Sequence, residues 1–398
     1  MPRTTRLAGV AAVGLLAALA VLVAEGATAS TTPSAVADHP ARLDRFYGQH
    51  PAWRRCDTDT PASYQCATIT VPVDYAHPEG RTLHLRISRI RTSTPAKRHG
   101  VLLSNPGGPG DQGLADPLQL KDALAKSVLQ RYDLVGFDPR GLGASSPLHC
   151  GLTQDETQPS EPYRPYRAAT FAKDTADARA VAAKCTNSNG SQLLPYINTR
   201  NTARDMDVIR GVLGERKLSY IGWSYGTYLG AVYTQLFPRH SDRMVLDSAV
   251  DPNRFGRGLA LAMASGAEPA FKDWSRLIAH RDRTYHLGNT PAKVRATFWQ
   301  LVARADRTPL LHQGATRVDN TVGALVVQNQ WDPQTPLSSG RAMHHALHGS
   351  RLVYVRGGRG HAVYALPGAP TCVTRTVDAY LTGGHLPTTD VTCDASAR

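Results

Sequence analysis

One pentapeptide and its flanks constrain the fold more than any other part of this 398-residue chain. Residues 222–226 read Gly-Trp-Ser-Tyr-Gly, and they lie between a short apolar run and a run of helical character at 227–237. The two glycines permit a strand-to-helix turn so tight that a β-carbon at either position would clash, and such a turn presents the hydroxyl of Ser224. The pentapeptide alone is weak evidence. With a strand and a helix around it, a nucleophilic serine is a better interpretation than a fortuitous surface serine.

The remaining hydrophobic pattern predicts a mostly parallel sheet flanked by helices. From residue 100 onward, short and continuously apolar runs alternate with helical stretches, as strands buried on both faces of a parallel sheet do. The runs are 101–103, 134–137, 218–221, 244–246, 324–327 and 352–355. Ahead of them, 67–73 and 82–90 are rich in β-forming residues, and 82–90 alternates apolar and polar positions. We expect these two to form an antiparallel pair at a sheet edge.

Helix signals separate the predicted strands. Thr202 and Asp205 have the spacing of a capping box, and Gly214 is placed to end the helix that follows. Between 252 and 322 the strand pattern stops, and Thr290 is placed to cap an amphipathic helix. We predict a helical insertion there, between two core strands, where a lid would lie.

A serine nucleophile needs a base to accept its proton and an acid to orient that base. Asp332 follows the run 324–327, and His361 follows the run 352–355 in a glycine-rich loop. Each lies on a loop after a core strand, in the chain order Ser, Asp, His. Asp247 competes with Asp332 as the acid, and Asp332 before its proline has the alternative of being only a turn residue.

Acyl transfer also needs hydrogen-bond donors aimed at the developing oxyanion. Residues 105–110, Asn-Pro-Gly-Gly-Pro-Gly, follow the run 101–103, where this kind of site has its first donor loop. We assign the backbone N–H groups of Gly108 and Tyr225 to the oxyanion hole; a merely flexible turn is the alternative for the glycines. Together these features predict the α/β-hydrolase fold with a helical lid insertion.

The amino terminus has the pattern of a secretory signal. Two arginines precede the apolar run 7–24, which ends in Ala27-Thr28-Ala29, a pattern that signal peptidase cleaves. A membrane anchor is the alternative reading of that run. The expected product is secreted and extracellular, without stable membrane association after cleavage. The predicted parts are a signal peptide, 1–29; a leader or pro-segment without assigned structure, 30–50; a catalytic domain, 51–251 and 323–398; and the lid insertion, 252–322.

The six cysteines fall as three pairs of sequence neighbours, which suits disulfides in an oxidising compartment. Six cysteines allow 15 connectivities, so neighbour pairing is one hypothesis among several. It gives Cys56–Cys66, Cys150–Cys185 and Cys372–Cys393. None of the six has metal-binding spacing, and we expect neither a metal nor another cofactor.

The net charge of +13 does not indicate nucleic-acid binding. The basic residues are scattered and are not gathered into a stripe with aromatic residues. A solvated basic surface is the better interpretation, and no nucleic-acid partner is expected.

Four motifs carry a resemblance to a known family: 105–110, 136–141 (Gly-Phe-Asp-Pro-Arg-Gly), 222–227 and 330–333 (Gln-Trp-Asp-Pro). In them the chain resembles the secreted tripeptidyl aminopeptidases of actinomycetes, which are relatives of the prolyl iminopeptidases. The resemblance runs from about Cys56 to Cys393. It implies a serine exopeptidase that needs no cofactor and releases short peptides, typically tripeptides, from free amino termini. It also implies that Ser224, Asp332 and His361 are the triad.

The chain departs from the family pattern in three places. Asp111-Gln112 stand where relatives continue with small residues, Ser248 replaces an expected glycine, and the insertion is shorter than the family's lid. In relatives the lid helps to bound the cleft and supplies acidic groups for the substrate's ammonium group. The candidates here for that role are Asp247, Asp251 and Glu268, although no motif selects any of them.

Two other functions fit the same residues. A secreted carboxylesterase would use the same triad and oxyanion loop. An inactive paralogue would have kept the fold and lost its pocket when the lid shortened.

Overall fold

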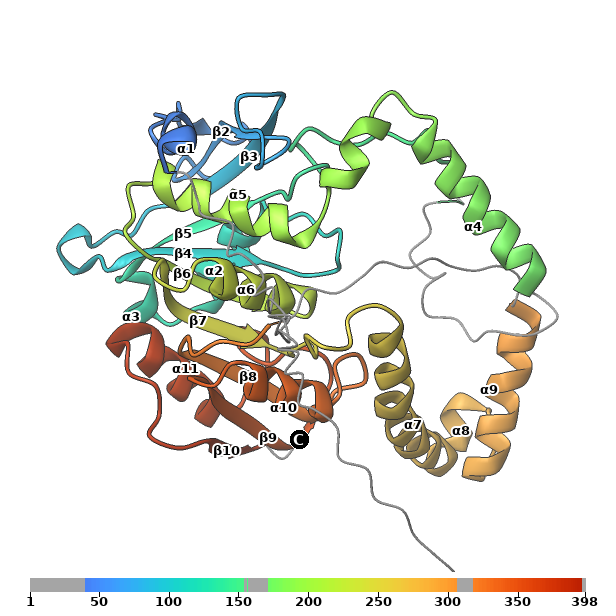
Figure 1. Cartoon of the computed structure of the whole chain (residues 1–398). Helices are drawn as coiled ribbons and strands as arrows, with labels where there is room; N and C mark the ends of the chain where they lie inside the picture. Colours follow the sequence, from blue (N-terminus) through green and yellow to red (C-terminus); the bar gives the residue numbers. More distant parts are fainter. Residues whose placement is uncertain (1–39, 154–155, 157–170, 306–317, 396–398) are drawn as a thin grey trace, which may run out of the picture. The chain divides into compact units, whose positions relative to one another are not determined.

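The computed structural model describes residues 40–153, 156, 171–305 and 318–395. Within them, ten strands form one sheet in the order β1-β2-β3-β5-β4-β6-β7-β8-β9-β10 (Figure 1). The strands are β1 (Arg54–Arg55), β2 (Tyr64–Pro72), β3 (Thr82–Ile90), β4 (Gly100–Asn105), β5 (Tyr132–Phe137), β6 (Leu218–Trp223), β7 (Ser241–Asp247), β8 (Ala324–Trp331), β9 (Arg351–Arg359) and β10 (Val391–Asp394).

The sheet is antiparallel at one edge and parallel elsewhere. β1, β2, β3 and β5 pair antiparallel, and every pairing from β5 through β4 to β10 is parallel. All six predicted core strands and the predicted antiparallel pair are confirmed. The sheet and its helices have the α/β-hydrolase architecture that the sequence predicted.

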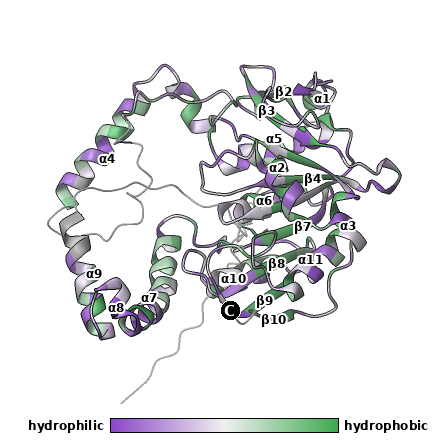
Figure 2. Cartoon of the chain, turned by 180° about the vertical axis from the view of Figure 1, so that it is seen from behind, coloured by the Kyte–Doolittle hydropathy of each residue, from purple (hydrophilic) through white to green (hydrophobic). Residues whose placement is uncertain are grey.

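Helices cover both faces of the sheet. They are α1 (Pro40–Tyr47), α2 (Asp116–Ala123), α3 (Lys126–Leu129), α4 (Phe171–Thr186), α5 (Thr199–Val212), α6 (Tyr225–Leu236), α7 (Arg257–His280), α8 (Asp282–Tyr285), α9 (Pro291–Ala305), α10 (Leu337–Ala346) and α11 (Thr371–Gly383), with short 3₁₀ turns at Pro95–Lys97 and Ser191–Tyr196. Residues of α1, α5, α6 and α10 belong to one buried apolar cluster, and residues of α2, α3 and α11 belong to a second. Figure 2 shows the hydrophobic residues concentrated in the strands between these helices.

Two local predictions need correction. The leader interval 30–50 contains α1, whose Leu43 and Phe46 are buried in the core. Helix α5 begins one turn earlier than the capping box implied: Asn198 is the N-cap, and its side chain accepts the N–H of Asn201. Thr202 lies inside the first turn, where its hydroxyl donates to the Asn198 carbonyl. Residues 30–39 of the leader interval and the predicted signal peptide lie outside the described residues.

The insertion is mainly helical in its described part. Helices α7, α8 and α9 occupy it, and Thr290 caps α9 by accepting the N–H of Lys293 at 3.2 Å. Helices α7 and α9 pack through aromatic rings, with Phe271 and Phe298 centroids 4.7 Å apart. Residues 306–317 of the insertion lie outside the described part of the chain. That the insertion acts as a lid remains a prediction.

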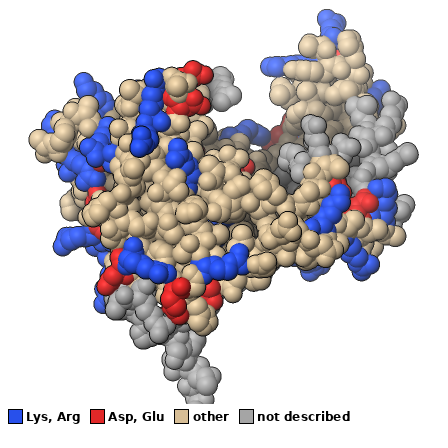
Figure 3. All heavy atoms as spheres, turned by 90° about the horizontal axis from the view of Figure 1, so that it is seen from above, with Lys and Arg blue, Asp and Glu red and all other residues tan. Residues whose placement is uncertain are grey.

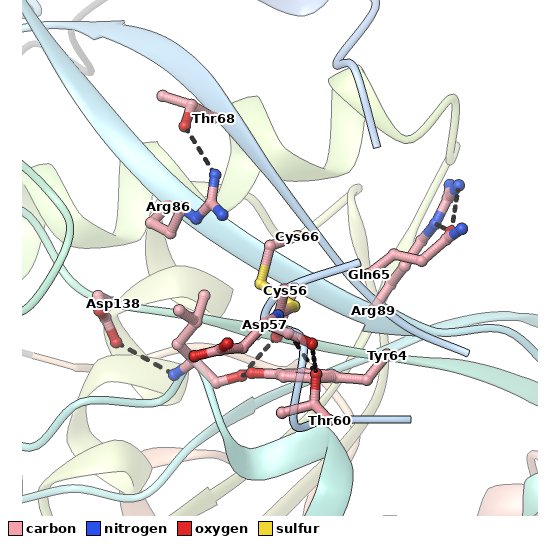
Figure 4. The surroundings of a disulfide bond; sticks show 12 residues. Cys56, Asp57, Thr60, Tyr64, Gln65, Cys66, Thr68, Arg86, Arg89 and Asp138 are labelled. Atoms are coloured by element: carbon pink, nitrogen blue, oxygen red, sulfur yellow. Dashed lines mark hydrogen bonds between the residues drawn. A yellow bond between two sulfur atoms is a disulfide. The ribbon is translucent and has the colours of Figure 1, made fainter. Parts of the chain in front are cut away.

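The three disulfides join the predicted partners. They are Cys56–Cys66, Cys150–Cys185 and Cys372–Cys393. Figure 4 shows the first of them beside β2, with Tyr64 and Asp138 nearby. Among the described residues, no helix has both the length and the hydropathy that crossing a bilayer requires. Lys and Arg are dispersed over the described part of the face drawn in Figure 3.

The motif at 136–141 builds a buried ion pair. Arg140 is 1% exposed, and its Nε lies 2.7 Å from Oδ2 of Asp205 on α5 while its Nη2 lies 2.5 Å from Oδ1. The hydroxyl of Tyr75 also donates to this carboxylate. The remaining guanidinium hydrogens reach the carbonyls of Pro72, Val73 and Tyr196. This family motif therefore ties β2 to α5 through a charge pair whose donors and acceptors are satisfied.

Candidate active site

Ser224 stands at a tight turn between β6 and α6. Its φ of 54° and ψ of −121° are angles that a residue with a side chain rarely adopts. A Cβ at Gly222 would lie 2.5 Å from the carbonyl oxygen of Gly226, and a Cβ at Gly226 would lie 2.6 Å from that of Asn105. Close packing thus requires both glycines. The N–H of Ser224 donates to the carbonyl of Asp247 on the next strand, which holds the turn in place.

Asp332 and His361 come from neighbouring parallel strands. Asp332 directly follows β8 and His361 follows β9, so both lie at the same edge of the sheet. Nδ1 of His361 lies 3.1 Å from each carboxylate oxygen of Asp332. The buried carboxylate also accepts the backbone N–H groups of Gln334 and Thr335 and the Thr335 hydroxyl. These contacts orient the carboxylate toward the imidazole.

The remaining imidazole nitrogen is positioned to act as a base. A carboxylate facing Nδ1 favours the tautomer with its proton on Nδ1, which leaves the lone pair on Nε2. Nε2 of His361 is buried, and none of the described residues hydrogen-bonds to it. His361 and Ser224 line the same cavity. The arrangement can therefore accept a proton from a hydroxyl placed in that cavity.

The loop after His361 is held by two residues at the end of β7. The fully buried carboxylate of Asp247 accepts the N–H groups of Val363 and the residue after it, at 2.7 to 3.1 Å. The hydroxyl of Ser248 accepts the N–H of Ala362 at 2.6 Å. Burial raises the pKa of Asp247 to about 6, although these hydrogen bonds and the nearby His361 act in the opposite direction. Both side chains position the base through its loop.

The loop 105–110 lies against the nucleophile. A Cβ at Gly107, which has φ +114°, would lie 2.6 Å from the carbonyl oxygen of Trp223 and 3.1 Å from Ser224 Cβ. Gly108 lines the cavity beside Ser224, and Tyr225 is the first residue of α6. The N–H groups of Gly108 and Tyr225 remain our predicted oxyanion donors.

The cavity at this edge has a volume of about 340 Å³. Its walls include Gly108, Asp111, Asp116, Trp223, Ser224 and His361. Two acidic residues thus line the same cavity as the nucleophile and the base, and none of the described lining residues is Lys or Arg. Among the described residues, no three His, Cys, Asp or Glu side chains are grouped so as to hold a metal ion.

None of the three residues suggested for the substrate's ammonium lines this cavity. Asp247 is fully buried and already holds the loop after His361. Asp251 is 6% exposed and pairs with Arg254 in the next turn of the chain. Glu268 lies on α7, 2.9 Å from Arg295 on α9. The structure gives each of them another partner and places none of them at the cavity wall; their role in substrate binding stays a prediction.

Sequence reasoning missed the two carboxylates that do line the cavity. The sequence analysis named Asp111 only as a departure from the family pattern. It did not name Asp116, although this residue lies six residues after the glycine-rich loop. A search of the first helix after that loop for acidic residues would have found it.

The sequence is similar to known peptidases and to one protein family. Residues 297–393, which contain Asp332 and His361, match the family described as TAP-like protein. A tripeptidyl aminopeptidase from Streptomyces lividans is 43% identical over 266 residues, 65% of this chain and 49% of that protein. The resemblance to tripeptidyl aminopeptidases is confirmed.

Two mycobacterial proteins match over a similar share of the chain. Serine protease Hip1 of Mycobacterium tuberculosis is 35% identical over 64% of this chain and 50% of that protein. Carboxylesterase B of the same species is 34% identical over 70% of this chain and 56% of that protein. This chain spans about half the length of the curated relatives that it matches.

Proposed function

We propose that the protein is a secreted serine exopeptidase that releases short peptides, tripeptides foremost, from free amino termini through an acyl-enzyme. The observation that carries the proposal is the arrangement around one cavity. Ser224 sits there on a strained turn, and His361 keeps a buried nitrogen without a hydrogen-bond partner among the described residues. Asp332 fixes the other side of that imidazole. Nucleophile, base and orienting acid are the parts that acyl transfer needs.

Acylation begins when Ser224 Oγ attacks the scissile carbonyl. Nε2 of His361 accepts the hydroxyl proton, and the buried Asp332 stabilises the imidazolium that forms. The N–H groups of Gly108 and Tyr225 stabilise the negative oxygen of the tetrahedral intermediate. The proton then passes from Nε2 to the departing amine, and the serine ester remains.

Deacylation repeats the steps with water as the nucleophile. Nε2 removes a proton from the water, the hydroxide adds to the ester carbonyl, and the same proton returns to Ser224 Oγ as the acid product leaves. The chain, the substrate and one water supply every bond and proton in this sequence.

Peptides are the substrate class that the relatives support best. Two of the matched proteins are a tripeptidyl aminopeptidase and a serine protease. Three disulfides suit an oxidising compartment outside the cytoplasm, as does the signal-like pattern at 1–29. Helices α7 to α9 stand in the insertion that we propose to act as the lid over the cleft.

The test compares one tripeptide anilide with its amino terminus free and again acetylated. The purified protein should release the chromophore from the free form and at most slowly from the acetylated one, and Ser224→Ala should abolish release. Equal rates on both forms would contradict exopeptidase action. Turnover of p-nitrophenyl esters without any peptide cleavage would favour a carboxylesterase, the activity named for the third relative.

A further inference from the structure

The cavity beside Ser224 is acidic in a basic protein. The sequence carries a net charge of +13, yet among the described residues at the cavity wall the charged side chains, apart from His361, are Asp111 and Asp116. A cavity lined by one sign of charge raises the local concentration of the opposite charge. The wall is therefore complementary to a cation that enters beside the nucleophile.

Asp116 is fixed by the structure around it. It is the first residue of α2, and the Leu114 N–H, two residues earlier, donates to the buried Asp138 carboxylate. The hydroxyls of Tyr64 and Ser88 both donate to the Leu114 carbonyl. Figure 4 shows Tyr64 next to the Cys56–Cys66 disulfide, with Asp138 nearby. Asp116 is thus held on a rigid support.

The carboxylate of Asp116 lacks a partner for one of its oxygens. The residue is 7% exposed, and none of the described residues hydrogen-bonds to its Oδ2. Buried polar groups in folded proteins nearly always have a partner, and an exception calls for an explanation. Asp116 lines the cavity, so a ligand there can supply the missing donor once the carboxylate rotates to bring this buried oxygen to the cavity wall. Asp111, which is exposed, lines the same cavity.

We infer that Asp116, assisted by Asp111, receives the α-ammonium group of the substrate peptide and so makes the enzyme selective for free amino termini. The inference rests on the proposed exopeptidase function and assigns residues to its specificity. An ammonium group provides three donors and a positive charge, so it satisfies the orphan oxygen and offsets the desolvation of the carboxylate. An acetylated terminus brings one neutral N–H and no charge.

The raised pKa of Asp116 is consistent with a carboxylate that binds a cationic ligand. Burial above all, together with the charges of Asp138 and Asp111, raises the pKa of Asp116 to about 7, while hydrogen bonding by Ser104 lowers it. A bound ammonium would favour the ionised form. The chain itself places no Lys or Arg among the described lining residues to do so.

Asp116→Asn tests the inference, with Asp122→Asn as its control on the same helix. Asn keeps the size and removes the charge, and Asp122 is exposed and outside the cavity lining. The readout is kcat/KM for Ala-Ala-Ala-p-nitroanilide divided by kcat/KM for its acetylated form. Asp116→Asn should lower this ratio at least tenfold, mainly through KM for the free peptide. Asp111→Asn should lower it less, and Asp122→Asn should leave it unchanged.

An unchanged ratio in both Asp116→Asn and Asp111→Asn would overturn the inference. So would an equal loss on both substrates by a folded Asp116→Asn protein, since that shows a structural role. Thermal melting of each variant establishes folding. If Asp116→Asn does not fold, the milder surface change at Asp111 still decides the question.

A second measurement separates this inference from the proposed function. The protein hydrolyses p-nitrophenyl acetate in this assay, and the inhibition constants of trialanine amide and of its acetylated form are measured. Stronger inhibition by the free amine, lost in Asp116→Asn, would support the cation site even if the protein cleaved no peptide. Equal inhibition by the two amides in the parental protein would overturn the site whether or not peptides are cleaved.

Discussion

His361 Nδ1 lies 3.1 Å from each of the two carboxylate oxygens of Asp332. Asp332→Asn replaces one oxygen with a donor, which repels Nδ1–H and favours the tautomer with its proton on Nε2. Turnover should fall by about 10³- to 10⁴-fold at neutral pH. Steady-state hydrolysis of a p-nitrophenyl ester measures it, with Asp122→Asn as the exposed control. A loss below tenfold, in a variant that melts like the parent, would point to another acid.

Ser248 combines a strained backbone with a hydrogen bond to the loop after His361. Its φ is 60°, and its hydroxyl accepts the Ala362 N–H. Ser248→Gly removes the bond and relieves the strain, whereas Ser248→Ala removes the bond and keeps the strain. We expect the alanine variant to unfold about 1 kcal/mol more easily than the glycine variant, measured by urea denaturation. Both should lower kcat, because both release the loop; an unchanged kcat would contradict its positioning role.

The sequence was sufficient for the central sheet because each core strand is a continuous apolar run with a clear helix after it. The serine turn was predictable because the glycines at 222 and 226 flank Ser224 between a clear strand and a clear helix, although the close contact that requires Gly226 is with the distant Asn105. Asp332 and His361 were predictable from their places after late strands. These features depend on short-range pattern and on the geometry common to all parallel sheets.

What the sequence missed depends on contacts between distant segments. Asp247 and Asp116 are both buried acidic residues near a strand end or a loop, and only their hydrogen-bond partners distinguish them. The first is saturated by backbone N–H groups from the loop after β9, whereas the second keeps an oxygen without a hydrogen-bond partner among the described residues. Helix α5 shows the same limit at short range, since Asn198 and Thr202 are both good caps and the fold selects Asn198.

The buried pair of Arg140 and Asp205 should make a large contribution to stability when only one partner is removed. Arg140→Met leaves the Asp205 carboxylate buried without its cation, at an expected cost of about 3 to 5 kcal/mol in the free energy of unfolding. Urea denaturation measures it, and exposed Arg216→Met is the control. Arg140→Met combined with Asp205→Leu should recover much of the loss. A single variant as stable as the parent would show that the pair is dispensable.

The preference for free amino termini should depend on pH through Asp116. Its pKa is raised to about 7, so the carboxylate is ionised above that pH and becomes neutral below it. Between pH 7.5 and 5.5 the peptide amine stays mostly charged while the ionised fraction of Asp116 falls more than about tenfold. The ratio of kcat/KM for the free anilide to that for the acetylated anilide should fall as this charge is lost. Protonation of His361 lowers both rates equally, so it does not change the ratio. Asp111 and Asp138 are the other carboxylates acting on Asp116, and their charges raise the pH at which the ratio changes. A ratio that is flat over this range in the parent, or that changes equally in Asp116→Asn, would contradict the assignment.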